Sequence, residues 1–119
     1  MKSHKELIVW QKAYKLVLEI YRITKKFPRE ETYCLISQIR SAAISVPSNI
    51  AEGYNRQSRK EYIHFLFIAY SSCAELDTQI LMAYDLKYLS QSDFDSINLL
   101  IEEVMKMLNR LIYKLKSKP

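Results

Sequence analysis

The sequence predicts an all-α protein, an antiparallel up-and-down four-helix bundle that forms a single domain over residues 1–119. Apolar residues recur at spacings of three and four in four consecutive segments, which is the period of an amphipathic helix. The 119 residues include only one glycine and three prolines, and this leaves little turn chemistry for β-hairpins. Short connections between the segments favour antiparallel neighbours. We expect helices at about 5–26, 30–53, 59–87 and 91–116.

The first expected helix has an apolar side and a basic side. Its apolar stripe consists of Leu7, Trp10, Tyr14, Val17 and Tyr21. At roughly 100° per residue, several cations gather on the opposite side. These cations are Lys5, Lys12, Lys15, Arg22 and Lys26. The helix is expected to end at Phe27, because a residue that precedes proline is pushed out of the α region.

The second expected helix contains both a proline and the only glycine of the chain. Its stripe is Ile36, Ile39, Ala43, Val46 and Ile50. The stripe keeps its phase across Pro47, although proline costs about 3 kcal/mol inside a helix. A loop would normally reset that phase, so we predict one helix with a kink at Pro47. Gly53 suits either a left-handed helix C-terminus or a close contact between helices.

Two capping boxes predict where the third and fourth helices begin. Ser58 and Glu61 have the Ser-x-x-Glu spacing, and Ser90 with Asp93 repeats the pattern. The apolar stripe of the fourth helix runs regularly from Phe94 to Leu115.

The third helix carries a second apolar stripe beside its first. This stripe consists of Ile63, Phe67, Tyr70 and Ala74. A helix of a lone small bundle needs one apolar face, so the extra surface indicates either a subunit interface or a more deeply buried helix.

The positive charge of the chain is unevenly distributed. The net charge is +5, and residues 1–29 hold eight Lys or Arg against Glu6 and Glu19. The other 90 residues therefore sum to −1. This asymmetry predicts a polyanionic partner or a basic surface made by repeating this element in an oligomer, or else a solvated helix face. The candidate nucleic-acid-binding residues are Lys12, Lys15, Arg22 and Lys26.

Other function classes find little support in the sequence. No apolar run is long enough to span a membrane, and the charged N-terminus lacks a signal-peptide stretch, so we expect a cytoplasmic protein. Cys34 and Cys73 match no metal or redox spacing and are expected to be buried. We therefore expect neither a metal site nor a cofactor.

A resemblance to a known family adds to this interpretation. Val9-Trp10-Gln11, Phe27-Pro28 and above all the segment from Gln38 to Gly53 resemble the 23S ribosomal RNA intervening-sequence proteins. The match covers roughly residues 5–90, and the fourth helix follows in pattern only. The family name records a genomic location and not an activity.

The resemblance implies a bacterial four-helix bundle that assembles as a ring, typically a homopentamer. It also implies similarity to the accessory protein of diversity-generating retroelements, a basic ring that works with reverse transcriptase and nucleic acid. Within the matching segment we expect structural roles for a set of five residues. These are Arg40, Pro47, Asn49, Glu52 and Gly53. Arg40 is expected to pair with Glu52 or Glu75 between helices.

One catalytic hypothesis needs to be weighed. Arg59 and His64 have the Arg-x4-His spacing of the HEPN ribonucleases, in which His acts as acid or base and Arg steadies the phosphate. The spacing is short and common, and apolar Ile63 and Phe65 flank His64. We therefore predict a non-enzymatic, homo-oligomeric scaffold that binds RNA, ribonucleoprotein or DNA through its first helix. The alternative is an adaptor that binds a protein partner and no nucleic acid.

Overall fold

The computed structural model describes residues 3–118, and over this range it is a four-helix bundle without strands. The long helices are α1 (Ile8–Thr24), α2 (Leu35–Tyr54), α3 (Arg59–Asp85) and α4 (Gln91–Lys116). Two short 3-10 helices, η1 (His4–Glu6) and η2 (Arg29–Glu31), precede α1 and α2. The predicted fold class is confirmed. Met1, Lys2 and Pro119 of the predicted domain lie outside the described residues.

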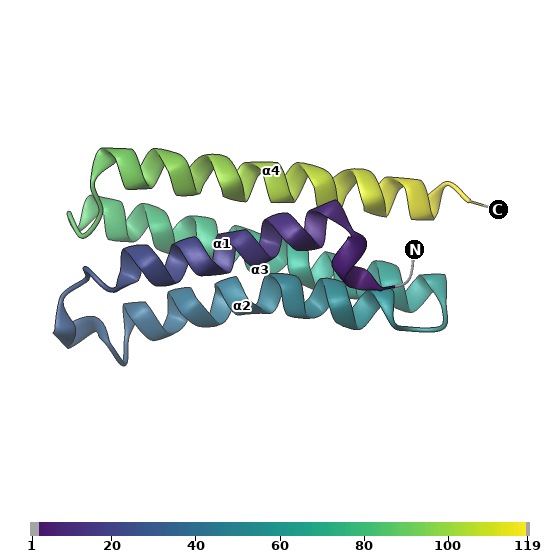
Figure 1. Cartoon of the computed structure of the whole chain (residues 1–119), viewed down its shortest axis with the longest axis horizontal. Helices are drawn as coiled ribbons and strands as arrows, with labels where there is room; N and C mark the ends of the chain where they lie inside the picture. The colour runs from purple at the N-terminus through teal and green to yellow at the C-terminus, as the bar shows by residue number, and fades with distance from the viewer. Residues whose placement is uncertain (1–2, 119) are drawn as a thin grey trace.

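The four long helices run side by side along the long axis of the molecule (Figure 1), and their contacts close into a square in which each helix packs on two others. Helix α1 packs on α2 and α4, and α3 packs on the same two helices. The α1–α2 and α3–α4 edges therefore lie on opposite sides of the bundle. The molecule is elongated, with extents of 49 × 23 × 21 Å, and none of the helices over residues 3–118 has the length and apolar character that a membrane crossing needs.

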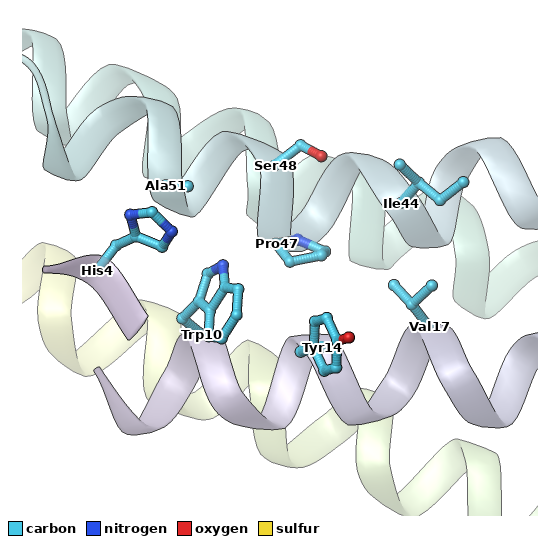
Figure 2. A pocket seen from close by; sticks show the side chains of 8 residues that line it. All are labelled: His4, Trp10, Tyr14, Val17, Ile44, Pro47, Ser48 and Ala51. Atoms are coloured by element: carbon cyan, nitrogen blue, oxygen red, sulfur yellow. The ribbon is translucent and has the colours of Figure 1, made fainter. Parts of the chain in front are cut away.

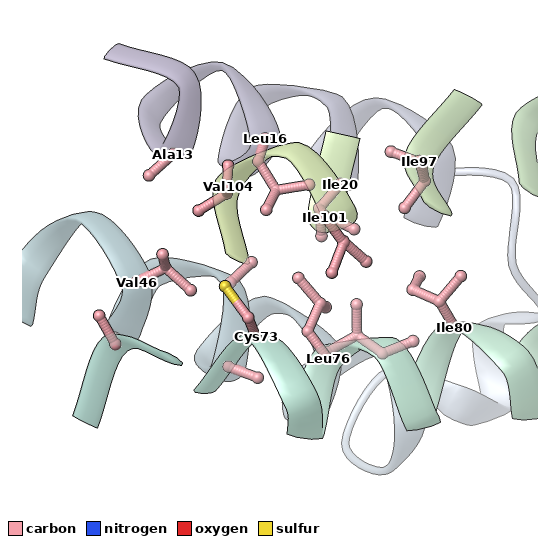
Figure 3. Packing of buried hydrophobic residues seen from close by; sticks show 14 of the residues in the cluster. Ala13, Leu16, Ile20, Val46, Cys73, Leu76, Ile80, Ile97, Ile101 and Val104 are labelled. Atoms are coloured by element: carbon pink, nitrogen blue, oxygen red, sulfur yellow. The ribbon is translucent and has the colours of Figure 1, made fainter. Parts of the chain in front are cut away.

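One continuous hydrophobic core fills the square (Figure 3). Helix α4 contributes the predicted residues, with Ile97, Ile101, Val104 and Leu108 buried. Helix α1 differs from the prediction, since its buried stripe is Val9, Ala13, Leu16, Ile20 and Ile23. The predicted stripe was wrong by about one residue. On α1, smaller aliphatic side chains form the buried stripe, and the large aromatic side chains lie beside it.

Two helices begin later than predicted. Leu7 has extended backbone angles (φ −72°, ψ 125°), so α1 begins at Ile8 after η1. Cys34 also leaves the helical region (φ −119°, ψ −103°), and α2 begins at Leu35. Cys34 is exposed, contrary to the expectation, because it lies in this connection. Cys73 is buried as expected, and burial raises the pKa of its thiol to about 12.

Helix α2 runs through Pro47 as one element, as the unbroken stripe predicted. Gly53 is buried near its end, where α2 meets α3. A Cβ atom on Gly53 would come within 2.8 Å of the Cβ of Phe65 and 3.1 Å of the carbonyl oxygen of Tyr62. Of the two predicted reasons for this glycine, the close helix contact is therefore confirmed.

Both predicted helix starts are confirmed. The Ser58 hydroxyl accepts a hydrogen bond from the backbone N–H of Glu61 at 3.1 Å, and the Ser90 hydroxyl accepts one from that of Asp93 at 3.1 Å. Each bond satisfies an amide that the first turn of a helix leaves unpaired.

Candidate nucleic-acid interface

The basic side of α1 packs along the acidic first half of α4. Lys12, one of the four candidate residues, forms an ion pair of 2.9 Å between its Nζ and the Oε1 of Glu103. Both side chains remain partly exposed. The charge that was predicted to face a phosphate is thus shared with a carboxylate of the neighbouring helix.

Asp93 holds two more of the candidate cations. Its carboxylate lies 3.1 Å from an Arg22 guanidinium nitrogen and 3.4 Å from the Lys26 Nζ. Partial burial opposes ionisation, but the Arg22 hydrogen bond and the two positive charges outweigh it, so the pKa of Asp93 is lowered. Arg22 also pairs with Glu19 at 3.2 Å, and hydrogen bonds to Glu19 and then Asp93 raise its pKa.

Lys15, the fourth candidate, is exposed and forms no ion pair within residues 3–118. The four predicted cations therefore lie along one helix, and three of them are bound to carboxylates. Sequence analysis could not foresee this, because the neutralising acids lie some 70 to 90 residues further along the chain.

An apolar groove opens at the α1–α2 edge (Figure 2). We call it the α1–α2 groove; its volume is about 350 Å³, and its lining includes Trp10, Tyr14 and Val17 from α1 and Ile44, Pro47 and Ala51 from α2. The rings of Trp10 and Tyr14 stack with centroids 5.2 Å apart. Tyr14 is 50% exposed and Ile44 is 42% exposed. Of these residues, Trp10, Tyr14 and Val17 were predicted as core; Tyr14 is exposed instead, and Trp10 and Val17 are half-buried at the border of the core.

A second apolar surface lies on the opposite side, at the α3–α4 edge. Phe67 of α3 is 43% exposed, and the Lys116 ammonium of α4 lies 4.9 Å from the centre of its ring. Leu81, fourteen residues after Phe67 and hence on the same helix face, is also exposed. Of the second stripe predicted for this helix, Ile63 and Tyr70 are partly buried and Ala74 is exposed. We refer to Phe67 and Leu81 as the α3–α4 edge.

Residues of the matching segment join the helices. Arg40 donates a hydrogen bond of 2.9 Å to the Thr24 hydroxyl and lies 4.4 Å from the centre of the Tyr21 ring. The expected pairing with Glu52 or Glu75 is wrong, because Arg40 faces α1. Glu52 pairs instead with Arg56 one turn later, at 3.1 Å.

A polar relay connects α2 with α3. The Asn49 amide donates to the carbonyl and hydroxyl oxygens of Ser45, at 2.8 and 2.9 Å. The Ser45 hydroxyl lies 2.8 Å from that of Ser72 on α3. Such a network satisfies partly buried polar groups and fixes the register of the two helices.

Arg59 and His64, the proposed ribonuclease pair, are both exposed on α3. Five residues correspond to about 140° around a helix, so the two side chains leave it in different directions. The His64 ring packs edge-on against Phe65. Over residues 3–118, no group of three or more His, Cys, Asp or Glu side chains could hold a metal ion.

The last turns of α4 carry a functional candidate that sequence analysis missed. Asn109, Arg110, Tyr113 and Lys114 line a hollow of about 600 Å³, and Tyr113 is 74% exposed. The sequence held a signal for this surface, since Glu103 is the last acidic residue of the chain.

Fold and surface together define a small basic helical bundle. A model of the 23S rRNA-intervening sequence protein family matches residues 5–110, and the chain belongs to this family. A crystal structure of a protein of unknown function from the S23 ribosomal protein family of Bacteroides thetaiotaomicron is similar, with a TM-score of 0.83 and 25% identity over 88% of this chain and 98% of the other. No curated protein gives a significant match.

Proposed function

We propose that this protein is a non-enzymatic scaffold that assembles from several copies, as a ring of five, and binds nucleic acid. One observation carries the assembly: the α1–α2 groove and the α3–α4 edge are two unlike apolar surfaces on opposite sides of the bundle. A head-to-tail contact between unlike surfaces generates a ring when the rotation closes. Exposed apolar side chains on both surfaces favour burial in such a contact.

Light scattering tests the assembly. We expect a mass several times the monomer mass of 14.1 kDa, and about five times for the predicted pentamer. Ile44→Asp places a charge in the groove and should release monomers. Leu99→Asp alters an exposed leucine on α4 outside both surfaces and should leave the mass unchanged. A wild-type mass of 14.1 kDa would rule out the ring.

Nucleic acid is the proposed partner because the chain is basic and helical, and cations that contact phosphates supply most of the non-specific affinity. The α1 site predicted from the sequence is tested by replacing Lys12, Lys15, Arg22 and Lys26 with Ala. Fluorescence anisotropy at two salt concentrations would show weakened binding if α1 contacts the phosphates.

The protein adaptor is the second candidate function, and the exposed α1–α2 groove favours it. The adaptor would be supported if the protein binds no nucleic acid and if a pull-down retains a protein partner after nuclease treatment.

The ribonuclease alternative is tested by RNA cleavage. Cleavage by the wild type that is lost in His64→Ala would overturn the non-enzymatic proposal.

A further inference from the structure

The C-terminal end of the chain is a second basic segment, and it contains no acidic residue. Residues 1–103 contain 13 Lys or Arg and 13 Asp or Glu, so they sum to zero. Residues 104–119 contain five cations and no acid, which equals the net charge of +5. The five cations are Lys106, Arg110, Lys114, Lys116 and Lys118.

The packing of the bundle sharpens this division. The acidic first half of α4 faces the cations of α1, with Asp93 and Glu103 bound in ion pairs. Beyond Glu103 the pattern stops: within residues 3–118, Lys106, Arg110 and Lys114 form no ion pair. Glu6 is the acid that lines a neighbouring hollow together with Arg110 and Lys114.

Two of the cations at this end line a hollow together with an aromatic residue. Arg110, Tyr113 and Lys114 are spaced three and four residues apart, which places them on neighbouring parts of one helix face. Tyr113 is 74% exposed beside Arg110 and Lys114 in the same hollow of about 600 Å³. A tyrosine as exposed as this one is accessible to an unpaired base.

The start of α3 extends the positive surface. Arg59, Lys60 and Lys116 line a second hollow of about 530 Å³, whose floor includes Ile63 and Leu115. This hollow brings the cations at the start of α3 together with the last turn of α4. We call the combined surface, formed by Arg59, Lys60, Arg110, Tyr113, Lys114 and Lys116, the α4 basic end.

We propose that the α4 basic end is a binding site for single-stranded nucleic acid. The cations contact successive phosphates, and Tyr113 stacks on an unpaired base. Aromatic stacking together with a positive surface is the usual basis of single-strand binding. A duplex hides the faces of its bases, so an exposed Tyr113 gains nothing from it. This site rests on the nucleic-acid partner of the proposed function, but it consists of other residues than the four candidates of α1, so separate variants test the two sites.

Anisotropy with labelled single-stranded RNA, single-stranded DNA and duplex DNA of equal length, at 50 and 200 mM salt, tests the proposal. Arg110→Ala with Lys114→Ala should weaken single-strand binding about tenfold and reduce the salt slope by about 1.4, for two phosphate contacts. The matched control is Lys12→Ala with Lys15→Ala, which removes the same charge from α1 and should weaken binding less than about threefold.

Tyr113 distinguishes stacking from plain attraction of charges. Tyr113→Ala should weaken single-strand binding at least about fivefold and leave duplex binding unchanged, because stacking on one base is lost. Tyr113→Phe keeps the ring and should bind like the wild type. None of the altered side chains is buried, and circular dichroism verifies the fold of each variant.

Several outcomes would overturn the proposal. The absence of binding at 50 mM salt would remove the site. An α1 control that weakens binding as much as the α4 pair would place the contacts elsewhere. Equal losses for single strands and duplex in Tyr113→Ala would exclude stacking. Binding to phosphatidylserine vesicles but to no oligonucleotide would assign the surface to anionic lipid. None of the altered residues is Phe67 or Leu81 or is among those named for the α1–α2 groove, so light scattering tests the assembly separately.

Discussion

Lys12 of α1 and Glu103 of α4 form an ion pair of 2.9 Å, and this pair lies where the acidic residues of α4 end. Toward one end, the cations of α1 meet the carboxylates of α4. Toward the other end, α4 continues with cations alone, because Glu103 is the last acid in the sequence. Over residues 3–118, an anionic partner therefore meets more unpaired cations on α4 beyond this pair than along α1.

The first prediction concerns the cations that these acids neutralise. Asp93→Asn with Glu103→Gln releases Lys12 and Lys26, leaves Arg22 paired with Glu19 alone, and raises the net charge by two. If the α4 basic end is the binding site, the affinity for single-stranded nucleic acid should rise only slightly, because the two units of added net charge act from a distance. The measurement is fluorescence anisotropy at low salt.

The matched control for that double variant is Glu30→Gln with Asp77→Asn. Both residues are exposed, and the net charge rises by the same two. We expect the two double variants to bind within about twofold of each other, since unpaired charges act here through the overall field. A much larger gain in the first variant would show that α1 is the nucleic-acid site.

The second prediction is a pH dependence of stability that arises at Asp93. The folded protein lowers the pKa of this carboxyl below 3.8. The ion pairs therefore stabilise the fold above the unfolded pKa, and this contribution is lost as the pH falls through the lower folded value. Urea unfolding should show wild type more stable than Asp93→Asn at pH 7, by about 0.2–1 kcal/mol, as is usual for partly exposed pairs.

The difference between the two proteins should shrink below pH 4, because protonated aspartic acid resembles asparagine. A difference that stays constant from pH 7 to pH 2.5 would mean that the amide changes stability by another route. The loss of the N-terminal cap is excluded as that route, since the Ser90 hydroxyl accepts from the backbone N–H of residue 93.

The third prediction concerns the contact between α2 and α3. Gly53→Ala should destabilise the protein, because the new Cβ would lie 2.8 Å from the Cβ of Phe65. Overpacking costs about 1–3 kcal/mol, and the better helix propensity of alanine returns about 1 kcal/mol. The Cβ of Phe65 and the carbonyl oxygen of Tyr62 are fixed to the α3 backbone, so relief requires the helices to separate.

Thermal or urea unfolding followed by circular dichroism measures this cost. Ser41→Ala, at an exposed position of the same helix, is the control and should change stability by less than about 0.5 kcal/mol. Gly53→Ala that matches or exceeds the wild-type stability would show that the two helices yield at this contact without strain.

Local signals predicted the helices well where a cap or a strong stripe was present. Ser58 and Ser90 located the starts of α3 and α4, and the α4 stripe from Ile97 to Leu108 is buried as predicted. The buried stripe of α1 was predicted one residue off because the apolar face of this helix is broad and its tyrosine and tryptophan residues were counted as core residues. Only packing against α2 decides that Trp10 and Tyr14 flank the core.

The candidate site was harder to predict than the fold. The charge excess of residues 1–29 is a sequence property, but its neutralisation depends on Asp93 and Glu103, which reach α1 only in the folded bundle. The α4 basic end was in principle visible, since no acid follows Glu103. It was overlooked because lysines at a helix C-terminus already have a local explanation in the helix dipole.

The fourth prediction concerns Pro47, which lines the α1–α2 groove opposite Trp10 and Tyr14 (Figure 2). Pro47→Ala restores a backbone N–H that can pair with the carbonyl of Ala43, so the fold should persist and α2 should straighten. The variant also removes the ring from the groove. We therefore expect the monomer to stay helical while the oligomeric mass falls, as measured by circular dichroism and light scattering.

Ser48→Ala is the matched control, because Ser48 lines the same groove without constraining the backbone, and it should leave the assembly intact. A crystal structure of Pro47→Ala would measure the helix axis directly. An unchanged mass together with an unchanged axis would show that the proline shapes neither α2 nor the assembly. A straightened α2 with an unchanged mass would show that Pro47 bends the helix but does not support the assembly. The contact between copies would then depend on the other groove side chains, above all Ile44.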